Sequence, residues 1–317
     1  MQNGQERKPD LVCSLEKEGF LGSFYQGDRY VDKAVIFVGG SGEPRNVVEA
    51  RAAILAREGY SVLAVGYYLW KPLSKQTVAI PLDYVERAID WLKGKCPVKV
   101  TKIGMIGLSL GAAYTALCGA YFPQISCAIV VSGFDFVVEG CKNMVIRQHR
   151  SYFTLHGENI PYEPAEALSH LPATLKKWKK DPCYGSRAMN RFYYNECFKD
   201  RTDASRIKVE NGNCDWLFLA PGYDDTWPSD QAVKRIIQVL REKQYPHRYE
   251  CVIYEKGSHL LGMPNEALKA MGDVDKLMRM LGKFLTMEKK YPKECMEARE
   301  ESYRKMLSFL HESLIGA

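Results

Sequence analysis

The residues most able to do chemistry in this 317-residue sequence surround one serine, Ser109. It lies in the pentapeptide Gly-Leu-Ser-Leu-Gly, residues 107–111, between an apolar β-like run (102–106) and a helix-like run (112–117). A serine on such a strand-to-helix turn holds its hydroxyl above the sheet edge, and glycines two residues away on either side avoid collisions within the turn. The backbone N–H of Leu110 then points to where the oxyanion of a tetrahedral intermediate would form. The pattern is typical of a nucleophilic serine.

A serine hydroxyl is a weak nucleophile near neutral pH, so Ser109 needs a base to accept its proton. Six histidines are available. We expect His259 to be the base because it lies in the loop that follows the last predicted strand, 248–254. We interpret the remaining histidines as structural, because they fall in a predicted insertion, before a strand or in the final helix: His149, His156, His170, His247 and His311.

The base in turn needs a carboxylate to orient it. After the preceding predicted strand, 216–220, the chain reads Pro-Gly-Tyr-Asp-Asp-Thr-Trp-Pro, residues 221–228. We prefer Asp225 to Asp224 because the spacing Gly-x-x-Asp-x-x-Pro places it at the usual position of this loop. Helix N-capping is the alternative role for either aspartate. The resulting order along the chain, serine then acid then histidine, is that of the α/β-hydrolases.

A second oxyanion donor is expected from the loop after the predicted strand 34–38. Its sequence, Gly-Gly-Ser-Gly at 39–42, lets backbone N–H groups approach a ligand closely. A tight turn without that role is the alternative. Within this loop we expect Gly40 or Ser41 to be the donor, and the residue types do not distinguish them. Three aromatic residues are named as candidate substrate contacts: Tyr67, Tyr68 and Trp227.

These residues must be positioned by the elements around them. Strand-like and helix-like segments alternate along much of the chain, which predicts a mostly parallel sheet with helices on both faces. Two helices, 267–286 and 294–314, are expected to close the domain. A segment rich in aromatics, prolines and charges interrupts the alternation and is interpreted as a helical cap. The predicted architecture is therefore an α/β-hydrolase core of residues 1–133 and 210–317 with a cap insertion of residues 134–209.

Composition limits the remaining possibilities. Hydrophobic residues make up 46% and charged residues 26%, as in ordinary globular enzymes. The net charge of +6 is spread without a long basic stripe, so nucleic acid is not an expected partner. Ten cysteines show neither CxxC pairs nor metal-ligand spacing, so we expect reduced thiols and no metal or other cofactor. Without a signal-peptide-like start or a run of 18 apolar residues, the expected location is cytoplasmic, with no membrane span.

Several short motifs together resemble the catalytic domain of the acyl-CoA thioesterases and the bile acid-CoA:amino acid N-acyltransferases. The resemblance covers residues 20–261. In that family a serine nucleophile accompanies thioester hydrolysis, whereas the amino acid transferases use cysteine, so the resemblance implies hydrolysis at Ser109. The family's elbow often has lysine after the serine, where this chain has Leu110. Besides the serine pentapeptide, the motifs are residues 38–42, 49–52, 65–68, 82–88, 217–220 and 257–259.

The residues and the resemblance together favour a serine hydrolase that cleaves an ester or thioester through an acyl-enzyme. An acyltransferase, in which an amine or alcohol resolves the acyl-enzyme in place of water, is one alternative. A non-catalytic binding protein on the same scaffold is another, and the complete set of serine, acid and histidine argues against it. The expected partner is a small acyl ester or thioester, and neither the acyl group nor the oligomeric state follows from the sequence.

Overall fold

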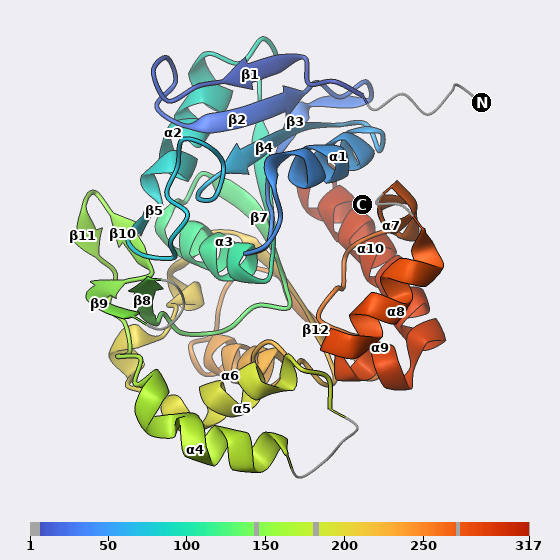
Figure 1. Ribbon diagram of the computed structural model, residues 1–317. Coiled ribbons are helices and arrows are strands. Elements are labelled where there is room, and N and C mark those ends of the chain that lie inside the picture. Colours follow the sequence, from blue (N-terminus) through green and yellow to red (C-terminus); the bar gives the residue numbers. More distant parts are fainter. Residues whose placement is uncertain (1–6, 143–145, 180–183, 271–272, 317) are drawn as a thin grey trace.

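One eight-stranded sheet runs through the computed structural model, which describes residues 7–142, 146–179, 184–270 and 273–316 (Figure 1). Its strand order is β1-β2-β4-β3-β6-β7-β12-β13. The pairs β1/β2 and β2/β4 are antiparallel and all the others are parallel, so the predicted mostly parallel sheet is confirmed. The strands are β1 Leu11–Cys13, β2 Leu21–Tyr25, β3 Tyr30–Val38, β4 Tyr60–Gly66, β6 Lys102–Leu108, β7 Ile125–Val131, β12 Asp215–Pro221 and β13 Tyr249–Tyr254.

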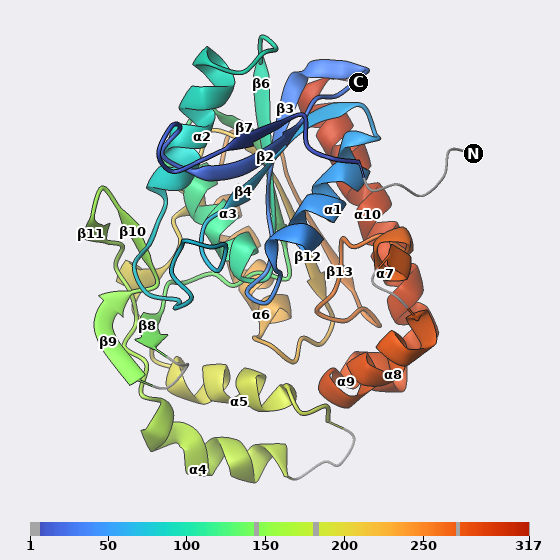
Figure 2. The same ribbon diagram turned by 45° about the horizontal axis from the view of Figure 1, so that its top comes forward.

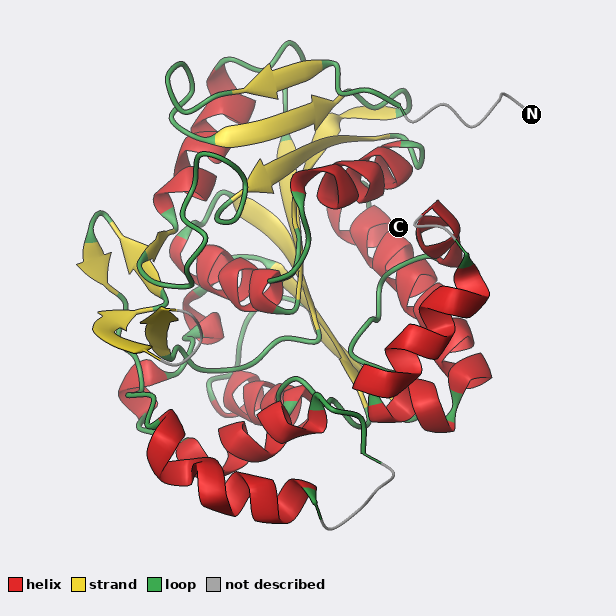
Figure 3. Ribbon diagram, in the orientation of Figure 1, coloured by secondary structure: helices red, strands yellow, loops and turns green. Residues whose placement is uncertain are grey.

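Helices cover both faces of this sheet (Figure 3). One face packs against α2 (Asp83–Gly94), α3 (Leu110–Tyr121) and α6 (Ser229–Glu242). The other packs against α1 (Arg45–Ala56) and α10 (Pro292–Leu314). Parallel strands covered on both sides are expected to be apolar along their whole length rather than alternating. The central strands have this character, and the last five residues of β3 are all buried.

Strand register brings the ends of neighbouring strands to one edge of the sheet. Val38 of β3 lies beside Gly107 of β6, and Leu108 of β6 lies beside Val131 of β7. Val131 in turn lies beside Leu219 of β12. The loops that leave these strands therefore start next to one another. They carry the glycine-rich segment, Ser109 and the two candidate aspartates.

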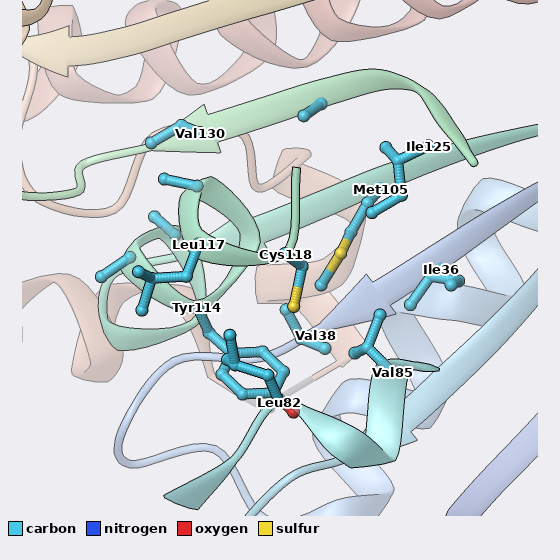
Figure 4. Packing of buried hydrophobic residues seen from close by; sticks show 14 of the residues in the cluster. Ile36, Val38, Leu82, Val85, Met105, Tyr114, Leu117, Cys118, Ile125 and Val130 are labelled. Atoms are coloured by element: carbon cyan, nitrogen blue, oxygen red, sulfur yellow. The ribbon is translucent and has the colours of Figure 1, made fainter. Parts of the chain in front are cut away.

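Helix α3, which begins directly after Ser109, is anchored by apolar side chains. Figure 4 shows Tyr114, Leu117 and Cys118 of this helix packed with Met105 of β6 and Val85 of α2. None of these five side chains is more than 2% exposed. Full burial of an apolar side chain of this size contributes about 1.5–3 kcal/mol, so α3 is a rigid base for the serine turn.

The C-terminal helices differ from the prediction. The predicted helix 267–286 is divided into three, because Asp273 begins a new helix by accepting the Lys276 N–H (3.0 Å) and Leu285 is extended. The predicted helix 294–314 is present and starts slightly earlier, with Pro292 in its first turn, where a missing N–H is tolerated. The three shorter helices are α7 (Asn265–Ala270), α8 (Val274–Phe284) and α9 (Thr286–Lys290).

The insertion at 134–209 differs from the predicted helical cap, because it contains strands as well as helices. Its first half forms short strands, and the helices α4 (Ala167–Trp178) and α5 (Ala188–Cys197) follow; α5 lies between α4 and the rest of the molecule (Figures 1 and 2). The strands are only two to six residues long, and the longest of them is mostly polar, so no apolar alternation marks them. They are β8 Glu139–Lys142 paired with β9 Ile146–Ser151, and β10 Phe153–Leu155 between β11 Glu158–Asn159 and β5 Ile80–Pro81.

The helices and the cysteines can be compared with the predictions of no membrane span and of reduced thiols. Among the described helices, none combines the length and the apolar character needed to cross a lipid bilayer. The nine cysteines within the described ranges all have free thiols, and six of them are buried. Burial raises the pKa of the Cys118 thiol well above its usual range, which keeps that thiol protonated. Cys183 lies outside the described residues.

Replacing Gly111 with alanine should destabilise the fold. A Cβ at this position would lie 2.3 Å from the carbonyl oxygen of Gly39, which belongs to the backbone of the neighbouring loop. We expect Gly111→Ala to cost about 1–3 kcal/mol, as overpacking in a core does, and thermal unfolding followed by circular dichroism should show a lower Tm. Gly94→Ala is the matched control, since its Cβ would meet no atom within 4 Å. Equal Tm values for both variants would contradict the close contact.

Candidate active site

Ser109 occupies a strained turn between β6 and α3. Its backbone angles are φ 56° and ψ −120°, a conformation that L-residues other than glycine rarely adopt. The turn is held by the Ser109 N–H, which donates to the carbonyl oxygen of Val131 (2.9 Å). The flanking glycines are required, because a Cβ at Gly107 would lie 2.0 Å from the carbonyl oxygen of Gly111. The turn leaves the Ser109 side chain partly exposed at the sheet edge.

The hydroxyl of Ser109 is in contact with an imidazole. His259 lies in the loop after β13, and its Nε2 is 2.8 Å from Ser109 Oγ. The imidazole is 9% exposed, and the edge of the Trp227 ring lies against it with 5.5 Å between ring centres. A neutral imidazole with its proton on Nδ1 can accept a hydrogen bond from the serine in this arrangement. The structure thus brings together the two residues, 150 positions apart, that the sequence analysis paired.

The carboxylate beside His259 belongs to Asp224 and not to Asp225. Asp224 Oδ2 is 2.8 Å from His259 Nδ1 and also accepts a hydrogen bond from the Ser229 hydroxyl (2.6 Å). The other oxygen, Oδ1, accepts the N–H of Thr226 (2.9 Å), which closes a local turn of the type that aspartate side chains favour. These three donors fix the orientation of a fully buried carboxylate.

Asp225, which the sequence analysis preferred, faces the C-terminal helices. Its Oδ2 accepts the N–H of Thr286 (2.8 Å), and its Oδ1 accepts the Thr286 hydroxyl. The spacing rule failed here because the turn at Asp224 sends the side chains of these adjacent residues to different partners. Burial raises the pKa of Asp225 from 3.8 to about 6, against the opposing effect of the Thr286 donors, and the nearby Asp224 adds to the rise.

The glycine-rich loop lies against Ser109. A Cβ at Gly40 would be 3.3 Å from Ser109 Cβ, so the loop backbone passes directly over the serine. The Gly40 N–H donates to Glu43 Oε2 (2.9 Å). Within the described part of the chain, the N–H groups of Ser41 and Leu110 have no hydrogen-bond partner. Ser41 and Leu110 therefore each have an available backbone N–H, whereas that of Gly40, the other loop residue proposed from the sequence, is taken by Glu43.

The three aromatic residues named as substrate contacts use their polar atoms to hold loops. Tyr67 donates its hydroxyl to the Gly39 carbonyl oxygen (2.9 Å), and Tyr68 donates to that of Ser41. Burial raises the pKa of both phenols, which keeps them protonated and able to donate. Trp227 Nε1 donates to the carbonyl oxygen of Ser132 (2.7 Å), and only its ring reaches the imidazole. All three side chains are buried, so these contacts position the site.

Arg191 of α5 is a residue that the sequence analysis did not single out. Its guanidinium makes two hydrogen bonds to the Asp230 carboxylate (2.6 and 3.1 Å) and a third to the backbone oxygen of Asp224 (3.1 Å). It also stacks 4.6 Å above the ring of Tyr223. The Arg191 backbone N–H donates to the carbonyl oxygen of Asp225 (3.1 Å). The insertion is thereby tied to the loop that carries Asp224, through partners too distant in sequence to be inferred from spacing.

The loop carrying His259 is held by α9 and α10. Ser258 donates its hydroxyl to Glu288, which also forms an ion pair with Arg299; the Glu288 and Arg299 side chains are completely buried. Further along the loop, the Gly262 N–H donates to the Ser302 hydroxyl (2.8 Å). A buried ion pair is not in itself strong evidence for stability. Here, however, the hydrogen bond from Ser258 to Glu288 fixes the residue next to His259.

One group of side chains in the described residues has the composition of a metal site. Asp83 and Glu86 of α2 and His156 of the β10–β11 turn offer ligand atoms within 4.8 Å of one another. His156 Nε2 is 2.9 Å from Glu86 Oε2, and this contact raises the pKa of the imidazole. The ion pair between His156 and Glu86 explains why these side chains lie together on the surface. The group includes none of the residues around Ser109.

The two aspartates should respond differently to removal of their charge. Asp224→Asn should lower kcat/KM for ester hydrolysis by about 10³–10⁴-fold, because the imidazole would lose the carboxylate that fixes its tautomer. Asp225→Asn should lower it by less than about tenfold, because Asp225 bonds to Thr286 and not to the imidazole. Steady-state kinetics on both variants, with folding checked by circular dichroism, would measure this. A larger loss in the Asp225 variant would restore the sequence-based assignment.

Asp225 should also give a recognisable pH dependence of stability. Because its pKa in the folded state, about 6, lies above the ordinary value of 3.8, folding binds its proton more tightly. Its contribution to stability is therefore fully present below about pH 4 and is lost as the pH rises through 6. The difference in unfolding free energy, wild type minus Asp225→Asn, should fall by about 2 kcal/mol between pH 4.5 and 7.5 in urea titrations. A difference that is constant or rises with pH would contradict this account.

The chain is similar in sequence to known acyl-coenzyme A thioesterases. Acyl-coenzyme A thioesterase 1 of Rattus norvegicus is 24% identical over 272 residues, which cover 85% of this chain and 58% of the relative. Mitochondrial acyl-coenzyme A thioesterase 2 of the same species is 25% identical over 274 residues, which cover 85% of this chain and 53% of the relative. The chain therefore spans about half the length of these relatives.

Solved structures show a similar fold at low sequence identity. A puromycin-hydrolyzing peptidase of Mycobacterium tuberculosis superposes with a TM-score of 0.53 at 12% identity, covering 94% of this chain and 38% of the peptidase. The 2,6-dihydroxy-pseudo-oxynicotine hydrolase superposes with a TM-score of 0.50 at 13% identity, covering 93% of this chain and 65% of that structure. The sequence family described as BAAT / Acyl-CoA thioester hydrolase C terminal matches residues 80–316. The chain therefore has the α/β-hydrolase fold and belongs to this family.

Proposed function

We propose that this chain hydrolyses acyl thioesters or esters with Ser109 as nucleophile, His259 as base and Asp224 as the acid that orients it. One observation carries the proposal: Ser109 Oγ lies 2.8 Å from His259 Nε2, and His259 Nδ1 lies 2.8 Å from a fully buried carboxylate. A nucleophile, a base and an orienting acid within hydrogen-bond reach of one another are the parts that acyl transfer to a serine requires.

In the first half of the reaction, His259 Nε2 takes the proton of Ser109 as Oγ attacks the carbonyl carbon. The carbonyl π-electrons move to oxygen and give a tetrahedral oxyanion. Asp224 stabilises the imidazolium that forms at the same time. The oxyanion then collapses, the bond to the leaving thiolate or alkoxide breaks, and the imidazolium gives its proton to that leaving group. The acyl group is left on Ser109 as an ester.

In the second half, water replaces the leaving group. His259 takes a proton from the water as its oxygen attacks the acyl-enzyme carbonyl, and a second oxyanion forms. When this collapses, the bond from the acyl carbon to Ser109 Oγ breaks, and His259 returns the proton to the serine. The products are a free carboxylic acid and the unmodified enzyme.

The oxyanion is assigned to two backbone donors, the N–H groups of Leu110 and Ser41. Leu110 begins α3, and the start of a helix carries a partial positive charge that favours an anion. Ser41 lies in the loop that passes over Ser109, next to Gly40, where a Cβ would be 3.3 Å from Ser109 Cβ. Each such donor typically contributes a factor of about 10²–10³ in kcat.

For the substrate we propose a thioester of coenzyme A. The relatives described above are named acyl-coenzyme A thioesterases, and they align with most of this chain. A net charge of +6 is compatible with a substrate that carries phosphates. Transfer of the acyl group to an amine or alcohol needs the same acyl-enzyme, so the products must be identified as well as the rate of substrate loss.

Ser109→Ala should abolish both probe labelling and turnover. We expect a fluorophosphonate probe to label the wild-type chain and not the variant, and hydrolysis of acyl-CoA to fall by at least about 10³-fold. Ser308→Ala, which removes an exposed hydroxyl on α10, is the matched control and should keep full labelling and activity. A panel of acyl-CoA thioesters and p-nitrophenyl esters, with added glycine or taurine, would rank leaving groups and detect transfer. Equal labelling of Ser109→Ala and wild type would refute the assignment.

A further inference from the structure

A partly buried ion pair lies behind the loop that passes over Ser109. Glu43 of this loop and Arg51 of α1 are joined through Oε1 and Nη1 at 2.7 Å, with side chains 18% and 4% exposed. The second oxygen of Glu43, Oε2, accepts the N–H of Gly40 at 2.9 Å. The Glu43 carboxylate therefore connects the loop backbone on one side with a nearly inaccessible guanidinium on the other.

Arg51 itself has three different neighbours. Its guanidinium pairs with Glu43, stacks 5.1 Å above the ring of Phe37 at the end of β3, and points Nη2 at the carbonyl oxygen of Gly262, 3.5 Å away. Gly262 belongs to the loop that carries His259. Arg51 thus lies between the loop over Ser109 and the loop of the base, and contacts both.

Three polar groups of residues 39–41 are held by side chains, and the Gly40 carbonyl oxygen accepts the Glu43 N–H (3.3 Å). The carbonyl oxygen of Gly39 accepts from Tyr67, and that of Ser41 accepts from Tyr68. The Gly40 N–H donates to Glu43. Among the described residues nothing accepts the Ser41 N–H, so the contacts that fix the loop leave this donor available.

We propose that Glu43 and Arg51 are positioning residues for the oxyanion: Glu43 fixes the Gly40 peptide so that the Ser41 N–H faces Ser109, and Arg51 neutralises the Glu43 carboxylate. This inference rests on the proposed function and deepens it. Buried ion pairs contribute little net stability, whereas the loss of one partner leaves an uncompensated charge. Here that charge would lie on the loop that binds the oxyanion, where a negative charge opposes the transition state.

The two single variants should lower kcat to different extents, because only one of them leaves an unpaired negative charge. Arg51→Met leaves an unpaired carboxylate beside the oxyanion and should lower kcat about 100-fold, with KM changed less than threefold. Glu43→Gln keeps an acceptor for the Gly40 N–H and adds no negative charge, so it should lower kcat about tenfold. The double variant should recover to about the level of Glu43→Gln, because the two residues act as a unit.

Arg45 and Glu49 supply the matched control on the same helix. They form an ion pair of 2.9 Å, and the further partners of Arg45 in the described structure are Ser23 and Trp70, outside the loop over Ser109. Arg45→Met and Glu49→Gln should leave kcat within twofold of wild type. A purely structural role of Arg51 would lower Tm and leave kcat of the folded protein unchanged, and the proposal would then be wrong. A double variant slower than Arg51→Met would also overturn it.

Hydrogen–deuterium exchange tests the loop contacts independently of the proposed catalytic function. Exchange at Gly40, whose N–H donates to Glu43, should be at least tenfold faster in Glu43→Ala than in wild type because alanine removes the acceptor, whether or not the chain hydrolyses any ester. Unchanged exchange there would overturn the positioning role. If exchange rises while wild-type Ser109 accepts neither a fluorophosphonate nor an acyl group, the loop contacts stand and the proposed function fails.

Discussion

The site depends on one strained backbone conformation, that of Ser109. A non-glycine residue at positive φ costs about 1–3 kcal/mol, and it persists only when its surroundings leave no alternative. Here β6 and α3 leave none, because the glycine on each side of the turn allows backbone contacts that a side chain would prevent. The apolar packing of α3 against the sheet supplies the free energy that maintains this turn. The position of the Ser109 hydroxyl is therefore determined by the core as much as by the surface.

Each of the other loops in the site is held by contacts of its own. Two phenols and a carboxylate hold the loop over Ser109, while a local turn and the Ser229 hydroxyl hold Asp224. The histidine loop is fixed through the buried pair of Glu288 and Arg299. Because parallel strands deliver these loops to one edge in register, each needs only short-range restraints to bring its residue into place. The geometry is thus assembled from independently restrained parts.

Much of this could be predicted from the sequence, for identifiable reasons. Ser109 and His259 are marked by local patterns, a glycine-flanked turn and a loop after the last strand, and the structure brings them together. The choice between Asp224 and Asp225 depends on which way two adjacent side chains point, which a hydrogen bond to Thr226 decides and no spacing reveals. Arg191 acts through Asp224 and Asp230, which are 33 and 39 positions away in the sequence. The strands of the insertion are too short and polar to show a period.

Arg191 has a consequence for how a ligand can reach the serine. The insertion and the loop of Asp224 share its guanidinium, so lifting α5 as a rigid body would break a buried ion pair and disturb the acid in the same movement. Because the proposed function needs Asp224 in place, opening of that kind would displace the acid each time a substrate entered. Access by rotation of individual side chains, with the helix left in place, avoids this conflict. Under the proposed function, α5 is therefore a fixed wall beside the site, and a ligand enters through rotation of individual side chains.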